Sequence, residues 1–145
     1  MTHETATKAL KFAALASTLF GLAMILALIS PLRAVFDIFL DLVHLPLDGQ
    51  QSLDSDSAHV LAAISGGLLV GLGALIWGIT TEVYAKSAET GGRIILTGVL
   101  AWFLPDSFGS YMVGAWFNVV LNTGFLALFA LPILLHRPDK QALAA

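Results

Sequence analysis

Four ionisable residues interrupt one of the most apolar stretches of the chain. The run SPLRAVFDIFLDLVHLPLDG holds Arg33, Asp37, Asp41 and His44 among mainly Leu, Val, Phe and Ile. At about 100° per residue, their spacing places all four within an arc of about 80° on a helix. The proline before them favours a helix start, and the Pro-Leu-Asp-Gly after them favours a turn. The pattern predicts a short helix at residues 31–45 with one polar stripe.

This stripe permits two interpretations. Carboxylate and imidazole groups suit a divalent metal, so a candidate metal site consists of Asp37, Asp41, His44 and His59. The alternative is a stripe that faces water and lipid headgroups, which the charge of Arg33 on the same stripe favours. A helix too short to span, and apolar on its other faces, is expected to lie in the membrane interface or to dip part-way in.

A second candidate group consists of two side-chain amides on one face of an apolar run. Asn118 and Asn122 are four residues apart, and an amide in hydrocarbon needs a hydrogen-bond partner. We expect this face to point into the bundle, towards Ser65, Thr97 or Thr18, and to hold helices together. The alternative is a polar lining for the carbonyl group of a quinone or of a lipid headgroup.

Arg93 is the ionisable residue nearest a predicted span, which makes it a candidate ligand-binding residue. Glu89, one helical turn earlier, is an expected ion-pair partner, and an arginine side chain can reach back to the membrane surface. The favoured interpretation is that Arg93 fixes the depth of its helix.

The composition is that of a membrane protein. Of 145 residues, 57% are apolar and only 12% are charged, whereas soluble domains have about 25% charged residues. The mean hydropathy is +0.85. A net charge of −3 gives no indication of a nucleic-acid partner. A sequence without cysteine excludes disulfides, thiol catalysis, iron–sulfur ligation and covalently attached haem.

Four apolar runs predict membrane spans at residues 12–30, 58–80, 86–104 and 111–135, all in one membrane domain. Pro105 and the polar residues after it predict a tight turn at 105–110. The first run is longer than the about 7–15 apolar residues of a signal peptide, so it is expected to be an anchor. The predicted fold is an all-α four-transmembrane-helix bundle. An additional amphipathic helix, interfacial or re-entrant, lies between the first two spans.

Basic residues predict the orientation of these spans. Arg33 alone lies on one side of the predicted membrane, and the positive-inside rule then places both termini in the cytoplasm and the short helix outside. The six basic residues on the other side are Lys8, Lys11, Lys86, Arg93, Arg137 and Lys140.

Small residues recur at four-residue spacing in the first two spans, a pattern that lets helices approach closely. We expect the two rows to pack against each other within one chain, and the alternative is a homodimer face. The rows are Ala13, Ser17 and Gly21 in the first span, and Ala63, Gly67 and Gly71 in the second.

The order of these parts resembles the DoxX-like group of small bacterial four-helix membrane proteins. The resemblance covers residues 12–135 and includes the glycine-rich run LAAISGGLLVGLGALI. It implies a four-helix fold in the bacterial inner membrane. Where that group has a Gly-Arg pair near the end of the third helix, this chain has AWFLPDSFGS. No residue of this chain can therefore take a role that depends on that arginine.

Three functions agree with these patterns. The favoured one is a non-enzymatic accessory or scaffold subunit beside a larger membrane complex, for example one of electron transport. The alternatives are a small homodimeric carrier or channel, and a membrane subunit that binds quinone, lipid or metal. The expected spans carry no ionisable residue at their centres, which argues against a carrier. Haem between the spans is not expected, since all four histidines lie at or beyond helix ends.

Overall fold

The computed structural model describes residues 1–29 and 31–136, which contain helices and no strands. Ser30, the first residue of the run quoted above, and the basic residues Arg137 and Lys140 lie outside the described residues. The helices are α1 (His3–Ala27), α2 (Arg33–His44), α3 (Asp56–Ile79), α4 (Ala88–Met112) and α5 (Trp116–Leu134), and a short π-helix, η1 (Thr80–Tyr84), continues α3.

Four of these helices are long and apolar enough to cross a membrane: α1, α3 with η1, α4 and α5. This confirms the prediction of an all-α chain with four candidate spans. Between the first two lies α2, a 12-residue helix, as the charged stripe predicted. Its position at the outer membrane surface stays a prediction.

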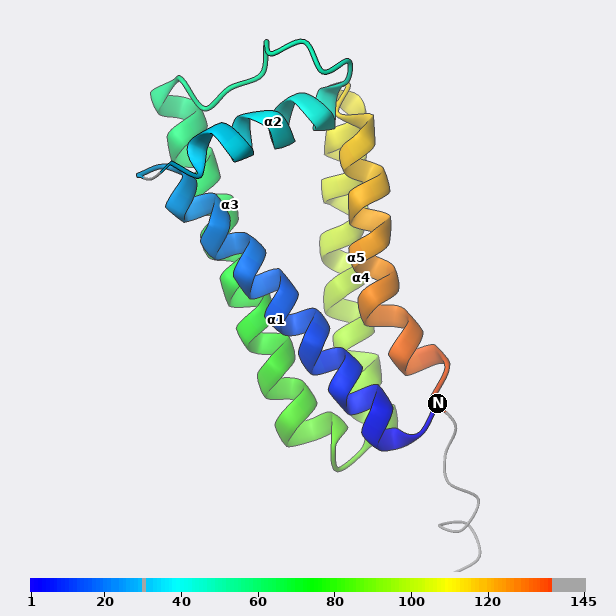
Figure 1. Ribbon diagram of the computed structural model, residues 1–145. Helices are drawn as coiled ribbons and strands as arrows, with labels where there is room; N and C mark the ends of the chain where they lie inside the picture. The colour runs from blue at the N-terminus through cyan, green and yellow to red at the C-terminus, as the bar shows by residue number, and fades with distance from the viewer. Residues whose placement is uncertain (30, 137–145) are drawn as a thin grey trace, which may run out of the picture.

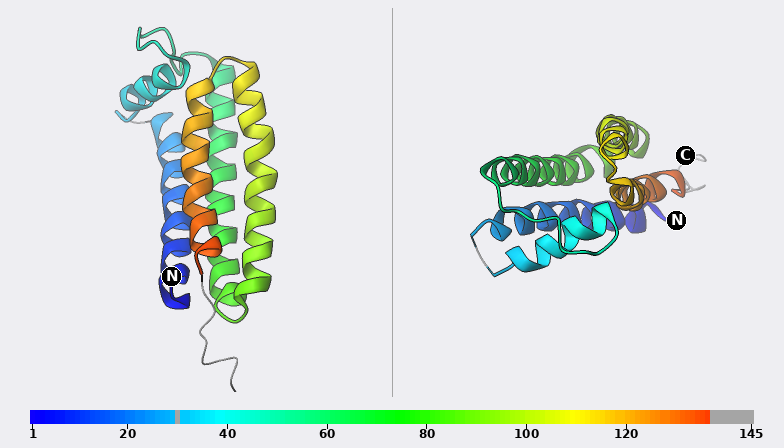
Figure 2. Two further views of the ribbon diagram at one scale, coloured as in Figure 1. Left: turned by 90° about the vertical axis from the view of Figure 1, so that its right-hand side faces the viewer. Right: turned by 90° about the horizontal axis from the view of Figure 1, so that it is seen from above.

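The four long helices form two pairs that meet at one end and diverge at the other. Figure 1 shows α1 beside α3 and α4 beside α5, with α2 across the divergent end. The views in Figure 2 show the same arrangement from the side and from above. At the convergent end, the amino group of Met1 donates a hydrogen bond to the carbonyl oxygen of Leu135 (2.9 Å), so the two ends of the described chain lie together.

Glycines bring α1 and α3 into backbone contact, but through a different row from the predicted one. A Cβ added to Gly66 would lie 2.7 Å from the carbonyl oxygen of Gly21, whereas one added to Gly67 or Gly71 would meet no atom within 4 Å. Ala13, Ser17 and Gly21 of α1 are buried as expected. The contacting face of α3 carries Ala62, Gly66 and Gly73, and the row Ala63, Gly67 and Gly71 faces outward.

The predicted turn at residues 105–110 is wrong, because α4 continues through Pro105 to Met112. Proline inside a membrane helix is tolerated where neighbouring groups compensate for the missing hydrogen bond. The chain reverses instead around Gly114, whose φ of +81° is a left-handed conformation that suits glycine. The extra two turns of α4 bring Asp106 and Ser107 beside α5.

Candidate functional site

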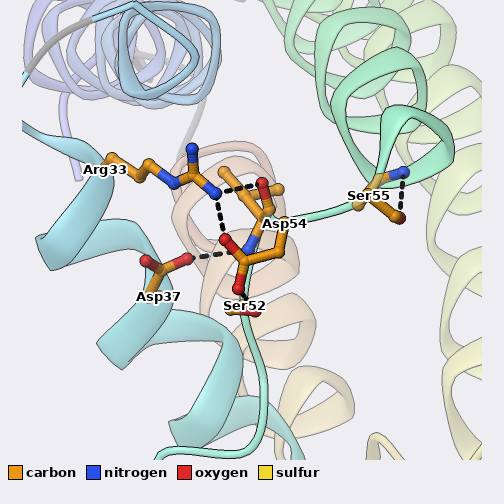
Figure 3. A network of polar contacts seen from close by, with 7 residues as sticks. Arg33, Asp37, Ser52, Asp54 and Ser55 are labelled. Carbon is orange, nitrogen blue, oxygen red and sulfur yellow. Dashed lines mark hydrogen bonds and ion pairs between the residues drawn. The ribbon is translucent and has the colours of Figure 1, made fainter.

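The charged stripe of α2 binds the loop that follows it. The guanidinium group of Arg33 donates to the carbonyl oxygen of Leu53 (2.7 Å) and pairs with Asp54. Oδ1 of Asp37 accepts the backbone N–H of Leu53 at 2.8 Å, so Leu53 is held from both sides (Figure 3). Arg33, Asp37 and Asp41 of the stripe therefore contact the 46–55 loop.

Two further residues of the predicted metal site, Asp41 and His44, have polar partners within the fold, whereas Nε2 of His59 is buried without a hydrogen-bond partner. Oδ2 of Asp41 accepts the backbone N–H of Gly49 at 3.0 Å, and Nδ1 of His44 lies 3.2 Å from the carbonyl oxygen of Leu40. Residues 1–29 and 31–136 contain no group of three or more His, Cys, Asp or Glu side chains placed to hold a metal ion. The described residues thus do not bring Asp37, Asp41, His44 and His59 together as one metal-binding group.

The Asp41 carboxylate is adapted to its loop contacts. The backbone N–H of Gly49 holds the pKa of Asp41 below the usual value of 3.8, although burial opposes this effect. The hydroxyl of Ser52, together with the charge of Arg33, lowers the pKa of Asp54 in the same way. Both carboxylates thus attach α2 to the loop while they are ionised.

Arg93 lies away from the two asparagines. It is exposed and borders a surface hollow near the start of α4, together with Glu89, Thr97 and His136. The predicted Glu89–Arg93 ion pair is absent from the described part of the chain, in which the ion pairs are Lys8–Glu4, Arg33–Asp54 and Lys86–Glu82. An exposed pair of this kind contributes only tenths of a kcal/mol, about 0.3–0.5, so the helix folds without it.

A cavity of about 560 Å³ lies between the two helix pairs. All five α-helices line it, and Phe39 of α2 contributes to the wall at the divergent end. Most of the lining is apolar. Its polar side chains are Ser65 of α3, Asp106 of α4, and Asn118 and Asn122 of α5.

Asp106 is the centre of the polar part of this cavity. Its Oδ1 atom accepts hydrogen bonds from Nδ2 of Asn122 (3.0 Å), Nδ2 of Asn118 (3.3 Å) and the hydroxyl of Ser110 (3.2 Å). Asn118 also donates to Oγ of Ser110 (2.9 Å), and Asn122 to Oγ of Ser107 (3.4 Å). Hydrogen bonds from several donors to one oxygen are the arrangement that stabilises a carboxylate.

The structure thus unites Asn118 and Asn122, as predicted, but around a different partner. The expected partners Thr97 and Thr18 donate to the carbonyl oxygens of Arg93 and Ala14 on their own helices. Asp106 was missed because Pro105 predicted a turn there. The sequence does contain a signal for this partner. A group of polar residues shortly before the two asparagines, Asp106, Ser107 and Ser110, lies on the end of α4 that faces α5.

The position of Asp106 corrects an argument about function. It lies inside the candidate span Ala88–Met112, six residues before its end, or about 9 Å along the helix at 1.5 Å per residue. We expected no ionisable residue at the centre of a span; Asp106 lies nearer the end of a helix that was expected to end at residue 104, so it adds an ionisable residue that a carrier could use. An ionisable residue inside a span that faces a cavity is a candidate functional residue.

Comparisons with protein families, with curated proteins and with solved structures found no match. The resemblance to the DoxX-like group stays a prediction.

Proposed function

We propose that this chain is a non-enzymatic, multi-pass membrane protein that binds a lipid-soluble small molecule in the cavity beside Asp106. The observation that carries the proposal is the cavity itself: about 560 Å³, mostly apolar, with one hydrogen-bonded polar cluster on its wall. Small-molecule sites typically have this composition, since apolar walls supply affinity and a few polar groups fix orientation.

The wall formed by α3 supports a lipid-soluble ligand. Leu68 lines the cavity and yet is 69% exposed, and Ser65 of the same wall is also exposed. In a bilayer this surface of α3 meets lipid. A molecule dissolved in the membrane can therefore reach the cavity sideways, without crossing water.

Native mass spectrometry of the purified protein in mild detergent tests this proposal, with dodecanol as the probe. We expect one bound dodecanol on the wild-type protein and none on the Leu121→Trp variant, because the larger side chain fills the cavity. Leu131→Trp is the matched control, since Leu131 belongs to the same helix but is 50% exposed and lies outside the cavity.

Equal binding of dodecanol to both tryptophan variants, or no binding to the wild type, would overturn the proposal. Should Leu121→Trp fail to fold, Ser65→Phe fills the cavity from the opposite wall and is expected to give the same loss.

A second candidate function is the one that the sequence favours, an accessory or scaffold subunit that packs beside a larger membrane complex. It is supported by the outward-facing row Ala63, Gly67 and Gly71, where an added Cβ on either glycine meets nothing. Helices of a partner can approach closely at such a row. Its test is the mass of the complex extracted in mild detergent. Gly67→Leu is expected to release a partner or a second copy, and an unchanged mass contradicts this role.

The proposed location is the bacterial inner membrane, with both termini in the cytoplasm. It rests on the six basic residues at one side of the predicted membrane and on the resemblance described above. In this orientation the divergent end, α2 and the polar part of the cavity face the outer half of the membrane.

A further inference from the structure

The hydrogen bonds around Asp106 use the side-chain N–H donors of both asparagines and leave three acceptor oxygens free. Each side-chain NH₂ group carries two hydrogens. Those of Asn118 point to Asp106 and Ser110, and those of Asn122 point to Asp106 and Ser107. Both amides have therefore used their donors inside the cluster.

Three acceptor oxygens remain: Oδ2 of Asp106 and the side-chain oxygens of Asn118 and Asn122. No hydrogen bond from residues 1–29 or 31–136 reaches them. None of the three belongs to the buried side-chain atoms that lack a partner, so they keep accessible surface. Since all three residues line the cavity, an occupant that carries hydrogen-bond donors satisfies these oxygens.

The carboxylate also lacks a countercharge. The cavity lining includes no Lys, Arg or His among the described residues, and none of the ion pairs in that part of the chain involves Asp106. A carboxylate in apolar surroundings is costly without a positive partner. The charge that balances it is therefore expected to come from the occupant.

Aromatic rings form much of the remaining wall. The centroids of Phe20 and Phe39 are 5.4 Å apart, those of Phe20 and Phe125 are 6.0 Å apart, and those of Trp102 and Phe125 are 6.4 Å apart. All four line the cavity, and Trp102 lies one turn before Asp106 on α4. The faces of such rings attract cations, with tryptophan the strongest.

We propose that the occupant is a lipophilic amine, that is, a protonated amino group on an apolar chain or ring. This inference rests on the proposed function of the same cavity. The ammonium group donates to Oδ2 of Asp106 and to the asparagine oxygens, and its apolar part packs against the aromatic and leucine side chains. A quinone fits less well because its carbonyl groups need donors, and the cavity-lining side chains with unused donors, Ser65 and Trp102, lie outside the polar cluster.

The test compares three probes on the purified protein in phosphatidylcholine nanodiscs: dodecylamine, dodecanol and decylubiquinone. An alkylamine resembles a lysine side chain, whose pKa is about 10.4, so dodecylamine is protonated at neutral pH. We expect dodecylamine to bind about tenfold or more tightly than dodecanol, since a hydrogen bond to a charged group contributes about 1.5–3 kcal/mol. Decylubiquinone is expected to bind no better than dodecanol.

Asp106→Asn keeps the shape of the side chain and removes its charge, so it is expected to abolish the preference for the amine while dodecanol still binds. Asp48→Asn removes the charge of an exposed loop residue and is expected to leave the preference unchanged. If Asp106→Asn fails to fold, Trp102→Leu is the second variant, and it is expected to weaken dodecylamine more than dodecanol.

The outcomes separate this inference from the proposed function. Equal affinities for amine and alcohol in the wild type, with binding of both lost in Leu121→Trp, would overturn the amine inference and leave the cavity as a binding site. Binding of neither probe would overturn the proposed function itself. Nanodiscs with phosphatidylethanolamine distinguish two sources of the amine, because competition with dodecylamine indicates a lipid headgroup and its absence indicates a free amine.

Discussion

At the scale of single residues, the aspartates outside and inside the bundle have different roles. Asp37 and Asp41 accept backbone N–H groups of the loop at residues 46–55 and fix it to α2. Asp106 accepts side-chain donors from α4 and α5 and keeps one oxygen free of them. Asp37 and Asp41 are therefore structural residues, and Asp106 is the candidate functional residue.

The loop contacts predict a dependence on pH. The pKa values of Asp41 and Asp54 are lowered in the folded protein, so the unfolded chain binds more protons than the folded one. Their stabilisation is complete above the usual aspartate pKa of about 3.9 and is lost as the pH falls through the lower folded values. Hydrogen exchange of residues 46–55, corrected for its intrinsic pH dependence, should therefore accelerate relative to the long helices in this acidic range.

Asp41→Asn should reproduce this acceleration at neutral pH, because the charged acceptor of the Gly49 N–H is lost. Asp56→Asn is the matched control, since Asp56 is exposed at the start of α3 and its substitution removes an equal charge. Loop protection that does not change between neutral and acidic pH in the wild-type protein would show that these carboxylates do not hold the loop.

At the scale of elements, α3 presents two rows of small residues with different surroundings. Gly66 meets the backbone of Gly21 on α1, and Gly67 faces open space. The sequence alone does not distinguish them, because both rows have small residues near four-residue spacing. The neighbour that decides between them is α1, which packs against Ala62, Gly66 and Gly73.

A pair of alanine substitutions tests this assignment. Gly66→Ala places a Cβ 2.7 Å from a backbone oxygen, so the helices have to separate, and overpacking of this kind costs about 1–3 kcal/mol. Gly67→Ala meets no atom and gains up to about 1 kcal/mol of helix propensity. Thermal unfolding in detergent should show a lower Tm for Gly66→Ala and an unchanged or higher Tm for Gly67→Ala. The reverse order would mean that the outward row is the packed one.

The four candidate spans and α2 could be predicted because their apolar runs and charge spacing are local signals. The end of α4 could not, since Pro105 and the polar residues after it also fit a turn. In the folded chain Asp106 accepts hydrogen bonds from Asn118 and Asn122, which lie on another helix and give no local signal near Pro105. Asn118 and Asn122 could be recognised as a pair because their four-residue spacing is a local signal. Their partner Asp106 could not, because it lies on another helix.

At the scale of the whole molecule, the divergence of the two helix pairs makes room for the cavity. Leu10, Tyr84 and Phe129 are fully buried in one core cluster, which holds the pairs together. Towards α2 the pairs separate, and the contact between them passes through large rings such as Phe20 and Phe125. The site thus lies where the bundle is open and is covered by a short helix that the loop contacts of Arg33 and Asp37 hold in place (Figures 1 and 3).

The most direct test of the account is the position of a bound amphiphile relative to Trp102. A protein with Trp77→Phe and Trp116→Phe reports from Trp102 on the cavity wall, and one with Trp102→Phe and Trp116→Phe reports from the exposed Trp77. Titration with brominated dodecanol, whose bromine atoms quench indole fluorescence, should quench Trp102 saturably and at lower concentration than Trp77. Equal and non-saturating quenching of both tryptophans would mean that the probe only dissolves in the surrounding lipid, and it would contradict a binding cavity beside Asp106.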